Sequence, residues 1–343
     1  MKTNKFFFSV LAAAGMMFTA CSNDELVDIQ GSADNAGQAI SFRVQGGAPE
    51  LRTTATTADY VDAFVVYGTD NAAFAASEPN IFNGITVARQ IGGAFDYNPK
   101  KYFKTGATTA RFAAFSPVSK FITLPTFAYS TGFSFNYEVI EPTADGKTSQ
   151  EDLLVAGTTT APGTSPTMVT MAFQHALSRI FVKATSDLSQ TVTIKALTLE
   201  NLYSTGTIAG ANPWTWSTSW DWTPTGNRDN NYNYVLASTG VAVEPNLSTA
   251  TLVTSMEQGM MIIPQKIVTT TPTPASTDFA LKVVYDVGNL VNEEAFIYLA
   301  NGYEFEMGTQ YAITIDFSSD DLIEIGFNIT VADFEDDPAG TMP

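Results

Sequence analysis

The chain of 343 residues is 45% apolar and 15% charged, and its 35 acidic and 17 basic side chains give a formal net charge of −18. A chain this acidic repels phosphate backbones, so we exclude a nucleic-acid partner. The apolar content is sufficient for a substantial core, the length suggests two domains, and the use of Val, Ile, Thr, Phe and Tyr favours strands over helices.

Residues 1–20 have the pattern of a secretory signal peptide. Two lysines form a basic start, and an apolar stretch of thirteen residues, Phe6–Phe18, comes directly after them. This stretch is too short to span a bilayer as a helix. Thr19 and Ala20 then supply the small residues that precede a cleavage site.

The chain holds one cysteine, Cys21, directly after this segment. The run Phe18–Cys21 resembles the lipobox of bacterial lipoproteins, in which the cysteine becomes the lipidated first residue, although a lipobox prefers Leu where Phe18 stands. A disulfide would need a second cysteine, and a metal site would need clustered ligands, which are absent here. We therefore expect Cys21 to carry palmitate-type acyl chains that anchor it in outer-membrane lipid, each buried CH₂ contributing about 0.8 kcal/mol.

Residues 21–38 are rich in Gly, Ala, Asn and Asp, and this composition predicts a flexible lipidated tether. The acidic start of the tether, Ser22–Glu25, has two interpretations. It resembles the tag that sends some lipoproteins of gut and oral anaerobes to the outer face of the outer membrane, and it also suits an ordinary polar tether.

Residues 39–165 are predicted to form an N-terminal β-sandwich. Its first strand places Ile40, Phe42 and Val44 on one face. Further strands are expected at the positions Val61–Tyr67, which we interpret as largely buried, Tyr102–Phe103 and Arg111–Phe115. The Thr- and Pro-rich stretch Thr158–Thr167 is the best linker in the chain.

Residues 166–343 are predicted to form a second, C-terminal β-sandwich of antiparallel strands with one face buried and one face in water. Alternating apolar residues indicate strands at Arg179–Ala184, Val192–Leu199, Leu281–Val287 and Tyr311–Phe317. A phase slip near Ala196 predicts a β-bulge in the second of these.

The most regular strand comes near the C-terminus. Its five apolar residues keep to one face through nine positions: Ile323, Ile325, Phe327, Ile329 and Val331. An ordinary strand at the end of the second domain and a strand that is donated to another subunit both fit this pattern.

Enzymatic signals are weak. His175 is the only histidine, and its place before a strand favours a hydrogen-bonded structural role over catalysis. The sequence shows no phosphate-binding loop, no HExxH run and no calcium-loop spacing. We therefore expect no enzyme activity, no metal site and no cofactor.

All four tryptophans lie within nine residues, as Trp214, Trp216, Trp220 and Trp222. Their alternation places them in pairs on common faces. Flat indoles could stack on sugar rings, which keeps a lipid-anchored, glycan-binding surface protein as the alternative function. The structural interpretation is a hairpin whose indoles cover the core of the second domain.

Six short segments, in this order behind a lipobox, together resemble the fimbrillin family, the lipoprotein-derived pilus subunits of Bacteroidetes-type bacteria. They are Ile40–Phe42, Arg52–Thr56, Glu151–Ala156, Phe173–Ile180, Ile263–Gln265 and Gly308–Tyr311. The resemblance covers nearly the whole chain. One departure is Phe334, which stands where the family often has a tryptophan.

This resemblance implies two tandem transthyretin-like β-sandwiches and a structural role in cell-surface fimbriae that support adhesion. It also implies a trypsin-like processing protease that cuts between Arg52 and Thr53 and releases the first strand with Cys21. A strand of another fimbrial subunit, matching Ile323–Val331, would then fill the vacated place. Anchor subunits of the family stay unprocessed and lipidated.

Overall fold

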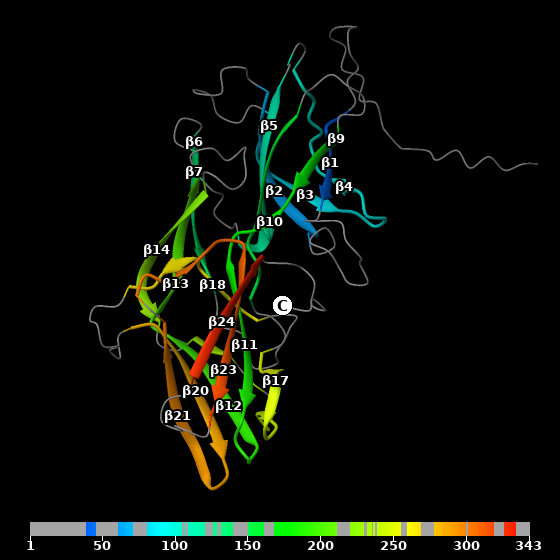
Figure 1. Ribbon diagram of the computed structural model, residues 1–343. Coiled ribbons are helices and arrows are strands. Elements are labelled where there is room, and N and C mark those ends of the chain that lie inside the picture. The colour runs from blue at the N-terminus through cyan, green and yellow to red at the C-terminus, as the bar shows by residue number, and fades with distance from the viewer. Residues whose placement is uncertain are drawn as a thin grey trace, which may run out of the picture. The chain divides into compact units, whose positions relative to one another are not determined.

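Strands make up nearly all of the regular structure (Figure 1). The computed structural model describes residues 39–45, 61–70, 81–104, 107, 109–120, 126–128, 132–139, 150–160, 168–210, 220–229, 232–234, 236, 239–254, 259–268, 278–299, 301–318 and 326–333. These ranges contain 24 strands, the short 3₁₀ helix η1 (Val118–Lys120) and no α-helix, and they all belong to the compact unit of residues 37–343. The predicted all-β class is confirmed.

An antiparallel six-stranded sheet organises the N-terminal part. Its order is β10 (Gln174–His175), β8 (Leu154–Thr160), β5 (Ala110–Ser116), β2 (Ala63–Thr69), β3 (Phe82–Arg89) and β4 (Phe95–Asp96). Both faces of its central strands are buried, which explains why β2 is a continuous apolar run. Phe64 and Val66 face one hydrophobic cluster, and Val65 and Tyr67 face another.

The first of these clusters is closed by a separate two-stranded sheet. β1 (Ser41–Gln45) pairs in parallel with β9 (Met168–Ala172), and the two strands lie side by side in Figure 1. Both strands contribute buried residues to the cluster, among them Phe42 and Met171. The first strand is therefore part of the core.

Two five-stranded sheets share the second cluster in the C-terminal part. One contains β17 (Leu247–Leu252), β11 (Ser178–Ser186), β23 (Thr309–Phe317) and β24 (Gly326–Asp333) in this order, with β18 (Met260–Ile262) also on β11. The other contains β15 (Tyr232–Tyr234), β12 (Val192–Glu200), β20 (Ala280–Val287) and β21 (Leu290–Tyr298), with β16 (Val241–Val243) also on β12. The ring centroids of Tyr285 and Phe317 lie 5.1 Å apart between them.

A four-stranded sheet combines residues from both halves of the sequence. Its order is β14 (Trp220–Asp229), β13 (Leu202–Gly210), β7 (Gly132–Glu138) and β6 (Thr126–Ala128), and a small pair, β19 (Gln265–Lys266) with β22 (Glu304–Phe305), completes the strands. The chain passes from β12 into β13 at Asn201, which has a φ of 59°. Asparagine tolerates this left-handed conformation, and its Nδ2 donates to the Asp278 carbonyl at 2.8 Å.

Several local predictions need correction. Tyr102–Phe103 forms no strand, and Thr158–Thr160, which we predicted as linker, continues β8. The β1–β9 and β11–β23 pairs are parallel rather than antiparallel. Strand pairing also links residues on the two sides of position 165, because β9 pairs with β1 and β13 pairs with β7. The bulge predicted near Ala196 is present between Ile194 and Ala196.

Candidate functional site

The place that β1 occupies is the candidate site, and we call the residues around it the β1 seat: strand β9 together with Phe64, Phe82, Tyr97 and Phe112. The backbone of β1 follows β9 through five register pairs, from Ser41 opposite Met168 to Gln45 opposite Ala172. Ahead of the strand, the Ile40 amide donates to the Lys101 carbonyl at 2.9 Å. The first strand is thus held by hydrogen bonds along its length and at its start.

Phe42 is the main apolar anchor of β1. Its side chain is 4% exposed, and four aromatic rings of the seat surround it edge to face. The centroid distances are 5.3 Å to Phe82, 5.7 Å to Phe64, 5.8 Å to Tyr97 and 5.8 Å to Phe112. Edge-to-face packing adds about 0.5–1.5 kcal/mol per pair to the burial of the ring.

The outer face of β1 is polar. Arg43 is exposed, and its Nε donates to Thr170 Oγ1 at 2.6 Å across the strand pair. Position 43 and position 170 are therefore neighbours on the outside of the β1–β9 sheet. The predicted alternation, with Ile40, Phe42 and Val44 inward, agrees with this arrangement, since Ile40 and Phe42 are buried and Val44 packs partly buried against the same cluster.

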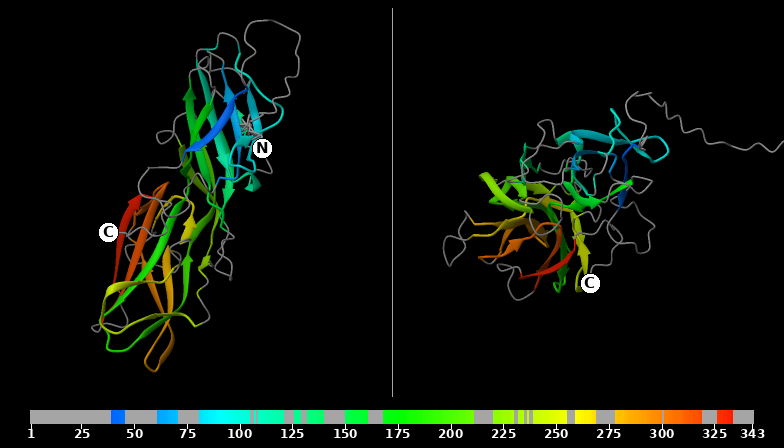
Figure 2. Two further views of the ribbon diagram at one scale, coloured as in Figure 1. Left: turned by 90° about the vertical axis from the view of Figure 1, so that its right-hand side faces the viewer. Right: turned by 90° about the horizontal axis from the view of Figure 1, so that it is seen from above.

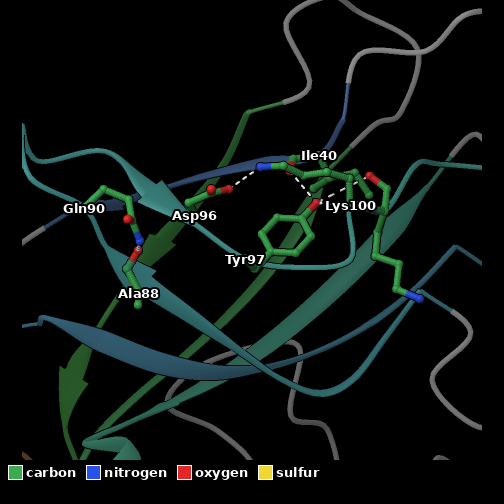
Figure 3. Close-up of polar contacts among 7 residues, drawn as sticks. Ile40, Ala88, Gln90, Asp96, Tyr97 and Lys100 are labelled. Carbon is green, nitrogen blue, oxygen red and sulfur yellow. Dashed lines mark hydrogen bonds and ion pairs between the residues drawn. The ribbon is translucent and has the colours of Figure 1, made fainter. Parts of the chain in front are cut away.

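Tyr97 ties β1 to the rest of the seat. Its phenol donates to the Ile40 carbonyl at 2.6 Å, as Figure 3 shows. Burial raises the pKa of Tyr97 to about 12, and the nearby Asp96 and Tyr102 add to the increase. The pKa of Asp96 is lowered by its hydrogen bond with Lys100. The Tyr97 phenol thus keeps its proton, and its donor role, well above neutral pH.

A Tyr97→Phe variant of the full chain should lose about 1–3 kcal/mol of unfolding free energy, because the buried Ile40 carbonyl loses its donor. The measurement is urea unfolding at pH 7, with Tyr102→Phe, a change of an exposed tyrosine, as the matched control. Equal stability of the Tyr97→Phe variant and the parent would contradict the assigned bond.

The same pair of proteins tests the pH dependence. Because the folded pKa of Tyr97 is about 12 and the ordinary value is about 10, the contribution of this phenol is complete below pH 10 and is lost as the pH rises toward 12. Burial also raises the pKa of Tyr67 and that of Tyr303 to about 12, and both phenols are present in both proteins. The quantity to follow is therefore the difference in unfolding free energy between the parent and the Tyr97→Phe variant. This difference in unfolding free energy should become smaller as the pH rises from 10 to 12.

β24 is the second predicted element of the site. It pairs antiparallel with β23, with Phe327 opposite Ile315, Ile329 opposite Ile313 and Val331 opposite Tyr311. The Ile329 side chain packs, partly buried, against the large C-terminal cluster. β24 ends the strand order of its sheet, so within the described chain its far edge pairs with no other strand.

Two of the four tryptophans can be placed. Trp220 and Trp222 are 6% and 8% exposed, and Trp222 Nε1 donates to the Ala176 carbonyl at 2.7 Å. The Trp220 ring packs on Phe133 with a centroid distance of 4.1 Å. These two indoles cover a core, as the structural interpretation expects, and their buried faces cannot stack on a sugar.

Several predicted residues lie outside the described ranges. They are Cys21, Arg52, Thr53, Trp214, Trp216, Ile323 and Ile325. His175 is described, and its Nδ1 contacts the carboxylate of Asp152, in keeping with a structural role.

The described ranges contain no cluster of three or more His, Cys, Asp or Glu side chains arranged for a metal ion. The same residues include no helix with the length and apolar character needed to cross a membrane.

Sequence reasoning missed two parts of the seat. β9 begins directly after the predicted linker. Its pairing with β1 could not be predicted, because pairing between strands that are distant in sequence leaves no local sequence pattern. Tyr97 lies far from β1 in sequence and resembles any other core tyrosine. Only the fold brings them together.

Three of the segments that carry the family resemblance meet in the fold. They are Glu151–Ala156, Phe173–Ile180 and Gly308–Tyr311. The Ala176 amide donates to the Leu153 carbonyl at 2.8 Å, and the Gly308 amide donates to the Leu177 carbonyl at 3.0 Å. These motifs connect the six-stranded sheet with the C-terminal strands, so their role is structural.

A protein-family model described as fimbrillin-like matches residues 52–333. Among solved structures, a fimbrial protein from Bacteroides vulgatus aligns with a TM-score of 0.63 at 14% identity, over 87% of this chain and 100% of that chain. A candidate cell adhesion protein from Bacteroides uniformis aligns with a TM-score of 0.51 at 17% identity, over 86% of this chain and 99% of that chain. These two likenesses concern the fold. No curated protein matches the chain.

Proposed function

The chain belongs to the fimbrillin-like family, and from this we propose that it is a non-catalytic structural subunit of cell-surface fimbriae that support adhesion. In this proposal it is exported as an outer-membrane lipoprotein anchored through Cys21, and it folds as two tandem transthyretin-like domains. Its partners are other fimbrial subunits, a processing protease and, before processing, membrane lipid.

Cleavage between Arg52 and Thr53 is the proposed step that makes the subunit competent for assembly. The cut separates β1 and the lipidated Cys21 from the rest of the chain, although β1 is still held in its seat by non-covalent contacts. Departure of β1 would expose the β9 edge and the four rings around Phe42 to water. An open strand edge beside apolar surface is a template for the addition of another strand.

The observation that supports this proposal most directly is the burial of β1 residues in the core. Ile40 and Phe42 are 1% and 4% exposed, yet they lie in a strand that one cut would detach. Burial of each such side chain contributes about 1.5–3 kcal/mol, so an empty seat is unstable relative to a refilled one. A strand that is both part of the core and removable is what subunit assembly by strand exchange requires.

N-terminal sequencing of the surface-exposed protein, combined with electron microscopy of the producing cells, tests the proposal. Fibres built from chains that start at Thr53 are the expected result. Chains that start at a lipidated Cys21 on cells without fibres would overturn it.

A further inference from the structure

Strand β21 forms a long sheet edge without the usual protection against another strand. Of the strands that end a sheet within the described chain, three have eight or more residues: β14, β21 and β24. Pro224 and a register shift interrupt β14, and β24 already has a place in the proposed assembly. β21 contains neither proline nor lysine, and its hairpin with β20 projects at one end of the C-terminal part (orange in Figure 2, left). An edge of this kind is a template for a further strand.

The same strand exposes apolar side chains. Three of the seven exposed large apolar residues of the described chain lie on it: Leu290, Val291 and Phe296, which are 44%, 64% and 42% exposed. From the neighbouring strand β20, Lys282 Nζ lies over the Phe296 ring, 5.6 Å from its centroid. One face of this ring is therefore covered from within the sheet, and the opposite face is turned toward the open edge.

We propose that β21 pairs with β21 of a second copy of this chain, antiparallel and across a two-fold axis, and that this contact joins fibres side by side. The inference rests on the proposed fibre, which repeats the same edge in every subunit and so raises its local concentration. The contact is separate from the strand exchange that links subunits along one fibre. A second copy is the occupant because the strand is self-complementary in one register.

Charge and polarity select that register. Facing residues of antiparallel strands lie on the same side of the sheet, so the two-fold axis must pass through a residue position. An axis at Glu293 or Glu294 sets two carboxylates directly opposite each other, which is destabilising. An axis at Asn292 or Ala295 sets both carboxylates against apolar side chains. An axis at Phe296 avoids both conflicts, and axes closer to either end pair only the end of the strand.

The axis at Phe296 gives complementary pairs on both faces of the joined sheets. The two phenyl rings lie opposite each other on the outer face, and an aromatic pair at facing positions is stabilising. Each Glu294 faces Tyr298 of the other copy, whose hydroxyl can donate to the carboxylate. On the inner face, Ala295 lies opposite Ile297, so an apolar side chain again meets an apolar one.

Lys282 makes this contact tolerable for an acidic chain. With a net charge of −18, two copies repel each other unless the charge at the contact is balanced. Lys282 Nζ lies 2.8 Å from Glu294 Oε1 in the same chain, so this carboxylate reaches the contact already paired. Each Phe296 ring keeps its own lysine on one face and gains the ring of the second copy on the other.

The double variant Glu294→Cys with Tyr298→Cys tests the register in fibres. The two cysteines face each other between copies, so oxidised fibres should give linked chains on non-reducing gels, with a 294–298 disulfide identified by mass spectrometry. Positions 294 and 298 of one strand are about 14 Å apart, beyond disulfide reach, so the link must join two chains. Each single variant is a matched control, because its cysteine has no cysteine opposite it. Cys21 leaves with the first segment in the proposed processing, so the introduced thiols are alone.

Phe296→Lys tests the contact itself. A lysine at the axis lies against the same lysine of the second copy, and like charges at facing positions are destabilising. Electron microscopy should therefore show fibres of normal length with at least tenfold fewer side-by-side bundles. Ile91→Lys is the matched control, because Ile91 is fully exposed in the turn between β3 and β4, which belong to a different sheet.

Each outcome is distinct. Linked chains at least tenfold more abundant in the double variant than in either single variant, together with separated Phe296→Lys fibres, support the proposal. Equal crosslinking of a single variant overturns the register, and a disulfide to a different protein overturns the second copy as occupant. Bundles that survive Phe296→Lys, or unmodified fibres that never associate sideways, overturn the contact and leave the proposed function standing. Cells that make no fibres from the unmodified chain contradict the proposed function and this inference with it.

Discussion

Arg52→Gln is expected to leave the chain at its lipidated, uncleaved length and to abolish fibres. A trypsin-like protease needs a basic residue before the scissile bond, and Arg52 is the only Lys or Arg between Arg43 and Arg89. The two alternatives lie within strands: Arg43 is in the middle of β1, and Arg89 ends β3 with its Nη2 donating to the Val61 carbonyl at 3.0 Å. The sequence between Arg43 and Arg89 therefore offers no other basic residue for cleavage.

The control for this experiment is Arg43→Gln, which removes an exposed arginine from β1 and keeps Arg52. This variant should be processed and should polymerise as the parent does. Immunoblots for chain length and electron microscopy for fibres are the measurements. Fibres of normal abundance from the Arg52→Gln variant would rule out cleavage at this bond as the assembly step.

The sequence was sufficient to predict those parts of the fold that depend on local alternation. Ile40, Phe42 and Val44 alternate with polar residues, and β1 forms with that face inward. The same holds for the bulge near Ala196, because an extra residue shifts the phase of the apolar pattern within one strand. In both cases the determining residues are neighbours along the chain.

Pairing between distant strands could not be predicted in this way. The partner of β1 is β9, more than a hundred residues later, and the two run parallel. Alternation reports which face of a strand is buried and carries no information about its neighbour or its direction. For the same reason the sequence does not predict the role of Tyr97. Its hydrogen bond to Ile40 depends on the fold, which brings the segment after β4 next to β1.

The C-terminal strand was predicted to be either an ordinary strand of the second domain or a strand donated to another subunit. Its apolar face was predicted with an ordinary terminal strand as the alternative, and the pairing with β23 shows that it does form part of the C-terminal sheet in the isolated chain. This pairing does not conflict with the proposed strand exchange, because a strand that pairs with its own sheet in one chain can pair with another subunit if a place for it opens there.

Phe42→Ala in the uncleaved chain is expected to lower the free energy of unfolding by about 3–5 kcal/mol, the range for removal of a buried phenylalanine. The four rings around it are held by β2, β3, β5 and the segment after β4, so they cannot all move inward to fill the space. Phe42→Leu keeps part of the volume and should lose less. Urea unfolding followed by tryptophan fluorescence measures both.

Arg43→Ala is the matched control, because it changes the next residue on the exposed face and should alter the free energy of unfolding by about 0.5 kcal/mol or less.

The Phe42→Ala substitution is expected to lower stability but to raise the rate of assembly. In the proposed processing, β1 would be held in its seat after cleavage only by non-covalent contacts. A cavity at position 42 should then speed its release and the polymerisation of the processed Phe42→Ala chain. Slower polymerisation of that chain than of the parent, with cleavage equally complete, would show that loss of β1 does not limit assembly. The variant thus tests two proposed roles of Phe42 separately: stabilising the uncleaved chain, and slowing the release of β1 after cleavage.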